Sequence, residues 1–178
     1  MNDEAVHGIP GDRELEPGDV VTLDVTAELE GYIADAALTV AVEPAAEADL
    51  ALIRAAERGL AAGMRAARAG RQLREVGAAV ERRVEGDGFA VLRPLTGHGV
   101  GRRIHEEPTV PNFDHPRATG LLTEGLVITV EPIVASGTHD VLTRPDGWTT
   151  VTGNRSRAAH AEHTIVITRG HPLVLTAA

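Results

Sequence analysis

Hydrophobic and polar residues alternate with two different spacings along the chain, which predicts an α+β fold. Apolar residues recur at three- and four-residue steps from Pro44 to Gly70 and again from Leu73 to Glu85, as on the buried face of an amphipathic helix. Shorter segments are rich in β-branched residues and are bounded by glycine or proline, which is typical of strands. We expect strands near residues 20–26, 32–42, 89–92, 125–132, 159–168 and 173–175, a hairpin at 139–151, and a proline-rich loop at 108–116.

Four acidic residues interrupt strands that are otherwise apolar. Asp24 and Asp35 belong to the first two predicted strands, which the turn at Glu30-Gly31 joins into a hairpin, so that both can point to one face. Glu131 and Glu162 occur in the same way in later strands. An ionised carboxylate in such a strand costs several kcal/mol unless it is paired or bound to a metal. For Asp24, the alternative is an exposed position on an edge strand.

The stretch from Thr96 to Pro108 contains two histidines, His98 and His105, among alternating glycines. Glycine on each side of His98 leaves room for a ligand and allows backbone angles that other residues rarely adopt. The alternative is an ordinary loop with surface histidines. Together with the four acids, His98 makes a set of five candidate ligands for a divalent metal. Four carboxylates exceed the charge that one ion requires, whereas two ions about 3.5–4 Å apart would use them all.

Composition restricts the class of protein further. The 178 residues are enough for one domain spanning 1–178, which would bury about two-thirds of its unfolded surface. The chain has no cysteine and therefore no disulfide, and its net charge of -9 without a basic run predicts neither a nucleic-acid nor a membrane partner. No apolar run reaches the roughly 18 residues of a transmembrane helix. We therefore expect a cytoplasmic protein.

Three other side chains leave alternatives open. Trp148 follows the predicted turn Pro145-Asp146-Gly147 and is either the wall of a pocket or part of the core. His160 and His163 flank Glu162, and we expect them at the surface or hydrogen-bonded to the neighbouring carboxylate.

Several motifs together resemble those of the type I methionine aminopeptidases of the pita-bread metallopeptidase family. The motifs are Asn2 to Pro10, the strand acids Asp24 and Asp35, Gly97 to Pro108, Val130-Glu131-Pro132, Asp146-Gly147-Trp148-Thr149, and Glu162-His163-Thr164. The resemblance extends from Asn2 to Thr176. It implies a pita-bread fold, in which helices cover a curved, mainly antiparallel sheet. It also implies removal of the initiator methionine from peptides and nascent proteins.

The same resemblance assigns roles to individual residues. Asp24 would bind one of two divalent ions, His98 and Glu131 the other, and Asp35 and Glu162 would bridge them. The ions would be Co, Mn, Fe(II) or Zn. His7 and His105 would be the catalytic histidines and, with Trp148, would contact the substrate. Hydrolysis would use a water that the ions activate.

Members of that family carry a leading segment before the motif at Asn2, so we expect an N-terminally short catalytic domain. A sheet face is then expected to remain uncovered; its residues are Val20, Leu23, Val25, Leu38 and Val40. We therefore expect a monomer of marginal stability, which self-associates through this face as a dimer, binds a partner there or aggregates. Two other functions remain open. One is a proline-specific dipeptidase of the same fold, and the other is an inactive homologue that binds peptides or proteins.

Overall fold

A computed structural model describes residues 1–177 and confirms the α+β class, with strands and helices close to the predicted positions. The helices are α1 (Glu47–Ala66) and α2 (Leu73–Gly86). The strands are β1 (Glu4–Val6), β2 (Val20–Leu29), β3 (Tyr32–Ala41), β4 (Ala90–Val91), β5 (Thr96–Gly99), β6 (Glu106–Pro111), β7 (Val127–Val130), β8 (Ile133–Ala135), β9 (Val141–Thr143), β10 (Thr150–Thr152), β11 (Ala158–His160), β12 (His163–Val166) and β13 (Leu173–Val174).

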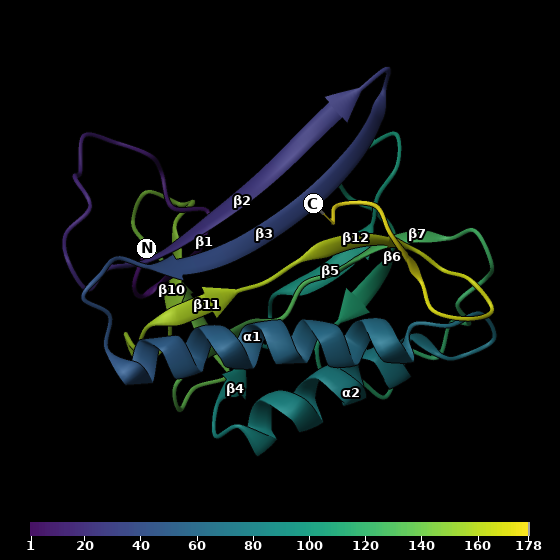
Figure 1. Ribbon diagram of the computed structural model, residues 1–178. Coiled ribbons are helices and arrows are strands. Elements are labelled where there is room, and N and C mark those ends of the chain that lie inside the picture. Colours follow the sequence, from purple (N-terminus) through teal and green to yellow (C-terminus); the bar gives the residue numbers. More distant parts are fainter. Residues whose placement is uncertain (178) are drawn as a thin grey trace.

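The two helices lie together on one side of the sheets, while the β2–β3 hairpin extends away on the opposite side (Figure 1). The helices pack closely because α1 carries Gly63 at their contact. A Cβ atom at Gly63 would lie 2.8 Å from side-chain atoms of Val80 on α2 and Val130 on β7. A capping box between Gln72 and Glu75 starts α2 by satisfying free backbone N–H groups. No helix within residues 1–177 is both long and apolar enough to cross a membrane.

The largest sheet has five strands in the order β13-β12-β7-β5-β6. Its strand β6 corrects the predicted proline-rich loop, because Glu106–Pro111 pairs with β5. Proline is compatible with β6 because this strand lies at the edge of the sheet, where half of its N–H groups need no strand partner. A core of buried aliphatic side chains, including Leu52, Val80 and Ile165, joins this sheet to both helices.

The expected strand at 159–168 is divided into two strands that belong to different sheets. β11 pairs with β8, whereas β12 pairs with β7 and β13. Ala161 and Glu162 lie at the break, where the Glu162 N–H donates to the Ala37 carbonyl of β3 over 2.9 Å. The chain therefore changes sheets at the residue that carries a predicted ligand.

The hairpin of β2 and β3 has two different faces. Its turn forms at Glu30 and Gly31, which both have positive φ angles, as two-residue hairpin turns require. The inward face carries Asp24, Asp35 and Thr39, of which Asp35 and Thr39 are buried. Asp24 is exposed, as the alternative of an edge-strand position predicted, although it points to the same side as Asp35. The outward face is apolar and exposed, with Leu23, Val25, Leu38 and Val40. The first predicted strand, although apolar in sequence on both faces, is therefore exposed on its outward face beyond Val21. Val20, expected on the uncovered face, is instead buried.

Candidate metal centre

All five predicted ligands line one cleft of about 910 Å³, although they come from distant parts of the chain. The hairpin contributes Asp24 from β2 and Asp35 from β3. The five-stranded sheet contributes His98 from β5. Glu131 lies between β7 and β8, and Glu162 lies between β11 and β12. The folded chain therefore brings together the residues that the sequence identified as candidates.

Strand register explains why Asp24 and Asp35 share a face. Asp24 is opposite Ala37 and Asp35 is opposite Thr26, so the two acids are diagonal neighbours on the inward side. The Thr26 hydroxyl donates to Asp35 Oδ1 over 3.0 Å, and Thr164 Oγ1 accepts from the Asp35 N–H over 2.9 Å. Burial and the negative charge of Asp35 raise the pKa of Asp24 to about 6.

His98 presents its Nε2 atom to the cleft. Its Nδ1–H donates to the Gly99 carbonyl over 2.9 Å, which fixes the tautomer and leaves the Nε2 lone pair free. Nε2 lies 3.4 Å from Glu131 Oε1. Burial lowers the pKa of His98, so the neutral form that can bind a metal is favoured.

The glycines around His98 serve close strand packing. A Cβ atom at Gly99 would lie 2.2 Å from the Glu107 carbonyl oxygen, and one at Gly97 would lie 2.7 Å from the Thr129 carbonyl oxygen. Neither Gly97 nor Gly99 has a positive φ angle. We expected glycine at these two positions for ligand access and unusual backbone angles. The structure gives a different reason, which is that β6 and β7 approach β5 too closely on either side for a Cβ atom.

The two glutamates are buried close to other negative charges. Burial raises the pKa of Glu131 and of Glu162, and the neighbouring carboxylates raise both further. The Thr129 hydroxyl opposes this effect at Glu131, because it donates to Oε1 over 2.6 Å. Glu162 Oε1 is buried without a hydrogen-bond partner in the described part of the chain. A divalent cation fits these residues, since it would keep the carboxylates ionised and occupy their free oxygen atoms.

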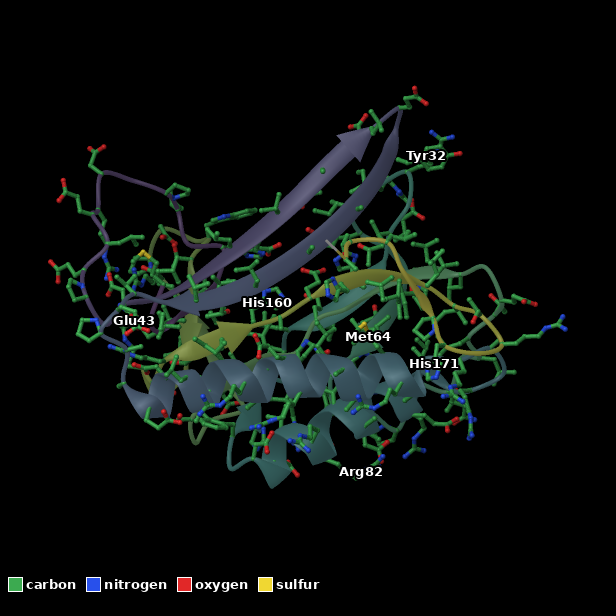
Figure 2. All side chains as sticks on the ribbon, in the orientation of Figure 1. Tyr32, Glu43, Met64, Arg82, His160 and His171 are labelled. Atoms are coloured by element: carbon green, nitrogen blue, oxygen red, sulfur yellow. The ribbon has the colours of Figure 1, made fainter. Side chains whose placement is uncertain are left out.

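His160 also belongs to this centre, which the sequence reasoning missed. It is only 2% exposed, whereas we expected a surface residue or a hydrogen bond to the neighbouring carboxylate. Nε2 lies 3.7 Å from Glu162 Oε2 and 4.0 Å from Glu131 Oε2, and burial lowers the pKa of His160 to about 3. Figure 2 shows His160 in the interior between β3 and α1. The available signal was its position two residues before Glu162.

His163, on the other side of Glu162, behaves differently. Its Nδ1 is 2.8 Å from the Thr176 hydroxyl, and it is half-buried. It therefore points away from the carboxylate cluster and into a polar contact with the C-terminal segment.

Four of the five predicted ligands and His160 fall into two groups that share Glu162, whereas Glu131 belongs to neither group. Asp24, His160 and Glu162 form one group, and Asp35, His98 and Glu162 form the other. Within each group the ligand atoms lie within 4.8 Å of one another. Oxygen and imidazole donors without thiolates suit Mn, Fe(II), Co and Zn. The arrangement therefore fits divalent metal.

The predicted catalytic histidines and Trp148 line the same cleft. His105 packs edge-on against His98, with ring centres 4.4 Å apart. His7 stacks on Trp148 at 5.0 Å and has a positive φ of 58°, a conformation that costs energy in a residue with a Cβ atom. Trp148 is 59% exposed, so it is a wall of the cleft and not a core residue.

The Asp146-Gly147-Trp148-Thr149 motif sets the position of that wall. Asp146 Oδ1 accepts from the N–H groups of Trp148 and Thr149, while Oδ2 accepts from the Thr149 hydroxyl. Gly147 has a φ of 73°, which glycine adopts without steric cost. This turn directs the indole toward His7.

Comparison with known proteins identifies relatives over nearly the whole chain. Residues 1–169 match Metallopeptidase family M24. The chain is 40% identical to methionine aminopeptidase 1 of Bacillus subtilis, over 94% of this chain and 68% of that protein. It is 42% identical to the methionine aminopeptidase of Treponema pallidum, over 99% of this chain and 69% of that protein.

Solved structures of two kinds of peptidase resemble the chain to different degrees. The methionine aminopeptidase of Thermotoga maritima superposes with a TM-score of 0.95 at 38% identity, covering 99% of this chain and 72% of that one. The prolidase of Pyrococcus furiosus superposes with a TM-score of 0.76 at 25% identity, covering 98% of this chain and 46% of that one. Both confirm the expected pita-bread architecture.

Proposed function

Because the chain belongs to metallopeptidase family M24, we propose that it is a metal-dependent aminopeptidase that removes the N-terminal methionine from peptides and proteins. The observation that carries the proposal is the pair of donor groups that share Glu162 in the cleft. The chain also covers more than two-thirds of relatives named methionine aminopeptidase, at about 40% identity. The cleft has the size of a small-molecule or peptide-end site.

The proposed ligands are the five residues expected from the sequence: Asp24, Asp35, His98, Glu131 and Glu162. We propose that they hold two divalent ions, of Co, Mn, Fe(II) or Zn. Bound divalent ions supply Lewis-acid chemistry, because they acidify water and polarise carbonyl groups. Support comes from the oxygen-rich donor set and from the raised pKa values of its carboxyl groups, which indicate negative charge that needs compensation.

Glu131 and the two catalytic histidines handle protons in this proposal. The Glu131 carboxylate, which lines the cleft, accepts a proton from the attacking water as general base. His105, beside His98 at the mouth of the cleft, donates a hydrogen bond to the carbonyl oxygen as negative charge develops on it. His7 contacts the scissile amide and assists protonation of the leaving amine.

Trp148 and His7 are the proposed walls for the methionine side chain. Their stacked rings form an aromatic surface within the cleft. A thioether packs favourably at about 5 Å from an aromatic ring. This contact favours a substrate that begins with a long, flexible, apolar side chain.

Two further parts of the proposal concern the surroundings of the enzyme. Nascent chains carry the initiator methionine where ribosomes work, so we place the enzyme in the cytoplasm. The apolar outward face of the β2–β3 hairpin would be the surface for self-association, because its large side chains are more than 45% exposed.

Peptide cleavage tests the function directly. With Mn or Co added, the chain should release methionine from Met-Ala-Ser and leave Xaa-Pro dipeptides intact. Preference for Xaa-Pro would instead support the proline-specific dipeptidase, and metal binding without cleavage of either would support the inactive binding protein.

The His105→Ala variant should lose roughly 10²–10⁴ in turnover with unchanged metal content. The matched control is His171→Ala at an exposed position outside the cleft, which should keep full activity. Loss of metal from the His105 variant would show a structural role.

A further inference from the structure

We propose that His160 is a metal ligand, which binds the same ion as Asp24. The inference rests on the proposed function, because it assumes that divalent ions occupy this cleft. It adds a second imidazole to the ligand set of five and gives each of the two ions one histidine.

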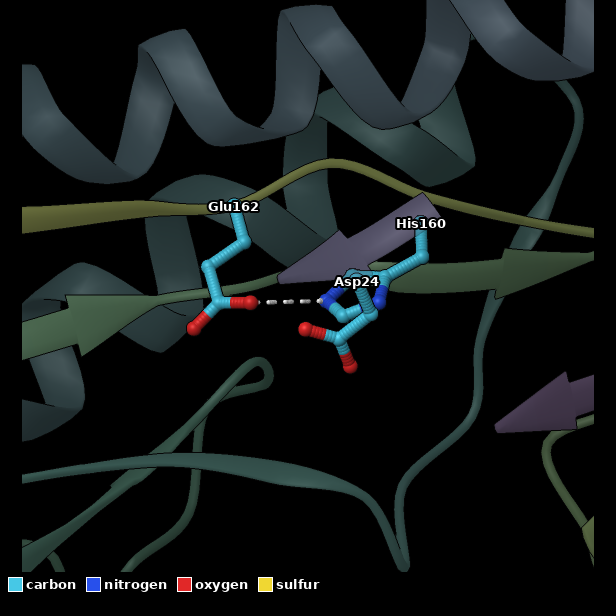
Figure 3. Close-up of side chains that lie close together, drawn as sticks. All are labelled: Asp24, His160 and Glu162. Carbon is cyan, nitrogen blue, oxygen red and sulfur yellow. Dashed lines mark ion pairs between the residues drawn. The ribbon is translucent and has the colours of Figure 1, made fainter. Parts of the chain in front are cut away.

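The geometry of the first donor group supports direct coordination. In Figure 3, the Asp24 carboxylate and the His160 ring face a common space beside Glu162. His160 Nε2 is 3.7 Å from Glu162 Oε2, which is too long for a hydrogen bond. Two donors that each lie about 2.1 Å from one ion are separated by about 3.0–4.2 Å. The separation of His160 and Glu162 is therefore that of two ligands on one ion.

The ring nitrogens of His160 are buried and make no hydrogen bond within residues 1–177. The side chain is fully buried, and neither Nδ1 nor Nε2 has a hydrogen-bond partner there. Buried polar atoms in folded proteins nearly always have such a partner. A cation near Nε2 would supply one.

The backbone of His160 is held in place by β3 and β8. The Thr39 hydroxyl donates to the His160 carbonyl over 2.8 Å and accepts from the His160 N–H over 2.9 Å. His160 is also paired with Ile133 in the β11–β8 ladder. Because the backbone is held from both sides, the position from which the buried ring extends toward Glu162 is fixed.

The second donor group has the same composition as the first. Asp35 and His98 correspond to Asp24 and His160, and Glu162 belongs to both groups. Each ion would thus have one aspartate and one imidazole, with Glu162 between the two ions. Imidazole favours Co and Zn over Mn relative to a carboxylate-only site. His160 would therefore shift the selectivity of the Asp24 ion toward Co and Zn.

Proton NMR of the Co(II)-loaded protein tests this by counting coordinated imidazoles, because each gives a strongly shifted, exchangeable N–H signal. The wild-type chain should show two such signals. His160→Gln and His160→Ala should each show one, as should His98→Gln. His163→Gln is the matched control, since its ring contacts Thr176, and it should keep two.

Titration calorimetry gives a second readout. His160→Gln should bind one equivalent of Co(II) at least 10-fold more weakly, since even outer partners of a ligand contribute about 10–100-fold to metal affinity. Its affinity for Mn should fall less. Melting curves of the metal-free variants establish that they fold.

The outcomes separate the two proposals. A wild-type chain with a single coordinated imidazole, or a His160→Gln variant with two, would overturn the inference and leave the proposed function intact. Should the variants fail to fold, the wild-type count alone decides. A wild-type chain that binds no Co(II) would contradict the proposed function itself.

Discussion

The metal centre lies between two regions that are stabilised in different ways. The five-stranded sheet has α1 and α2 on one side and an aliphatic core between them, so His98, Glu131 and Glu162 project from a densely packed body. The β2–β3 hairpin supplies Asp24 and Asp35 from one face while its other face is exposed. The two regions contribute comparable numbers of ligands but differ greatly in burial.

This difference shows what positions the hairpin. Few apolar side chains of the hairpin are buried apart from Val20, Val21 and Ala37, so polar contacts between β3 and the start of β12 contribute to its position. Thr164 holds the Asp35 backbone, and the Glu162 N–H bonds to Ala37. Bound ions would be held by ligands from both regions at once, and would thereby connect the hairpin to the five-stranded sheet. We therefore regard the centre as a structural link between the regions as well as a catalytic site.

The largest expected effect is the difference in stability between shortening an apolar side chain in the packed body and shortening one on the hairpin. Ile165→Ala, at a fully buried position of β12, should lower the free energy of unfolding by about 2–5 kcal/mol. Val25→Ala, on the exposed face of the hairpin, should change it by no more than about 0.5 kcal/mol at a protein concentration at which the chain is monomeric. Urea denaturation of both variants measures the difference. Equal costs would mean that the hairpin face is covered in solution.

An intermediate effect concerns pH in the metal-free protein. The pKa of Asp24 is raised to about 6 in the folded chain, so the folded state holds its proton more tightly than the unfolded state. Stability from this group is full at low pH and falls as pH rises from about 4 to about 6. Asp24→Asn removes that loss, and its melting temperature should gain on wild type across this interval. Thermal melts with a chelator at several pH values measure it.

Metal provides the control for that pH dependence. With saturating Mn, the wild-type carboxylates remain ionised because the ion compensates their charge. Above about pH 6, the melting temperature of the wild type should then exceed that of Asp24→Asn. A melting temperature of Asp24→Asn that falls relative to wild type between pH 4 and pH 6 in chelator would contradict the predicted sign.

Substitutions on the outward face of the β2–β3 hairpin should have the smallest effect on the free energy of unfolding, but a clear effect on self-association. Leu23 and Leu38 are opposite each other on β2 and β3 and are 54% and 53% exposed. Replacing both with threonine keeps strand propensity and should reduce self-association with a stability change near 0.5 kcal/mol or less. Light scattering after size exclusion measures the mass. Leu142→Thr, at a 56% exposed site on β9, is the control and should change nothing. A wild-type chain that is monomeric at all concentrations would exclude association through this face.

The sequence by itself determined both helices, most of the strands and most of the centre. Periodicity located both helices because their buried faces recur every three or four residues, and β-branched runs located most strands. Asp24, Asp35, Glu131 and Glu162 were identifiable because a carboxylate in an apolar strand needs a partner. Strand alternation placed the hairpin acids on one face, since the spacing and the turn are both local properties.

The tertiary structure alone decided which neighbours each residue has. His160 joined the centre because β11 ends beside β3, a contact between residues more than 100 positions apart. Gly97 and Gly99 proved necessary for the approach of β6 and β7, and β6 became a strand because it lies at a sheet edge that tolerates proline. Trp148 became a wall of the cleft through its contact with His7. These outcomes depend on long-range packing, which local spacing along a chain does not encode.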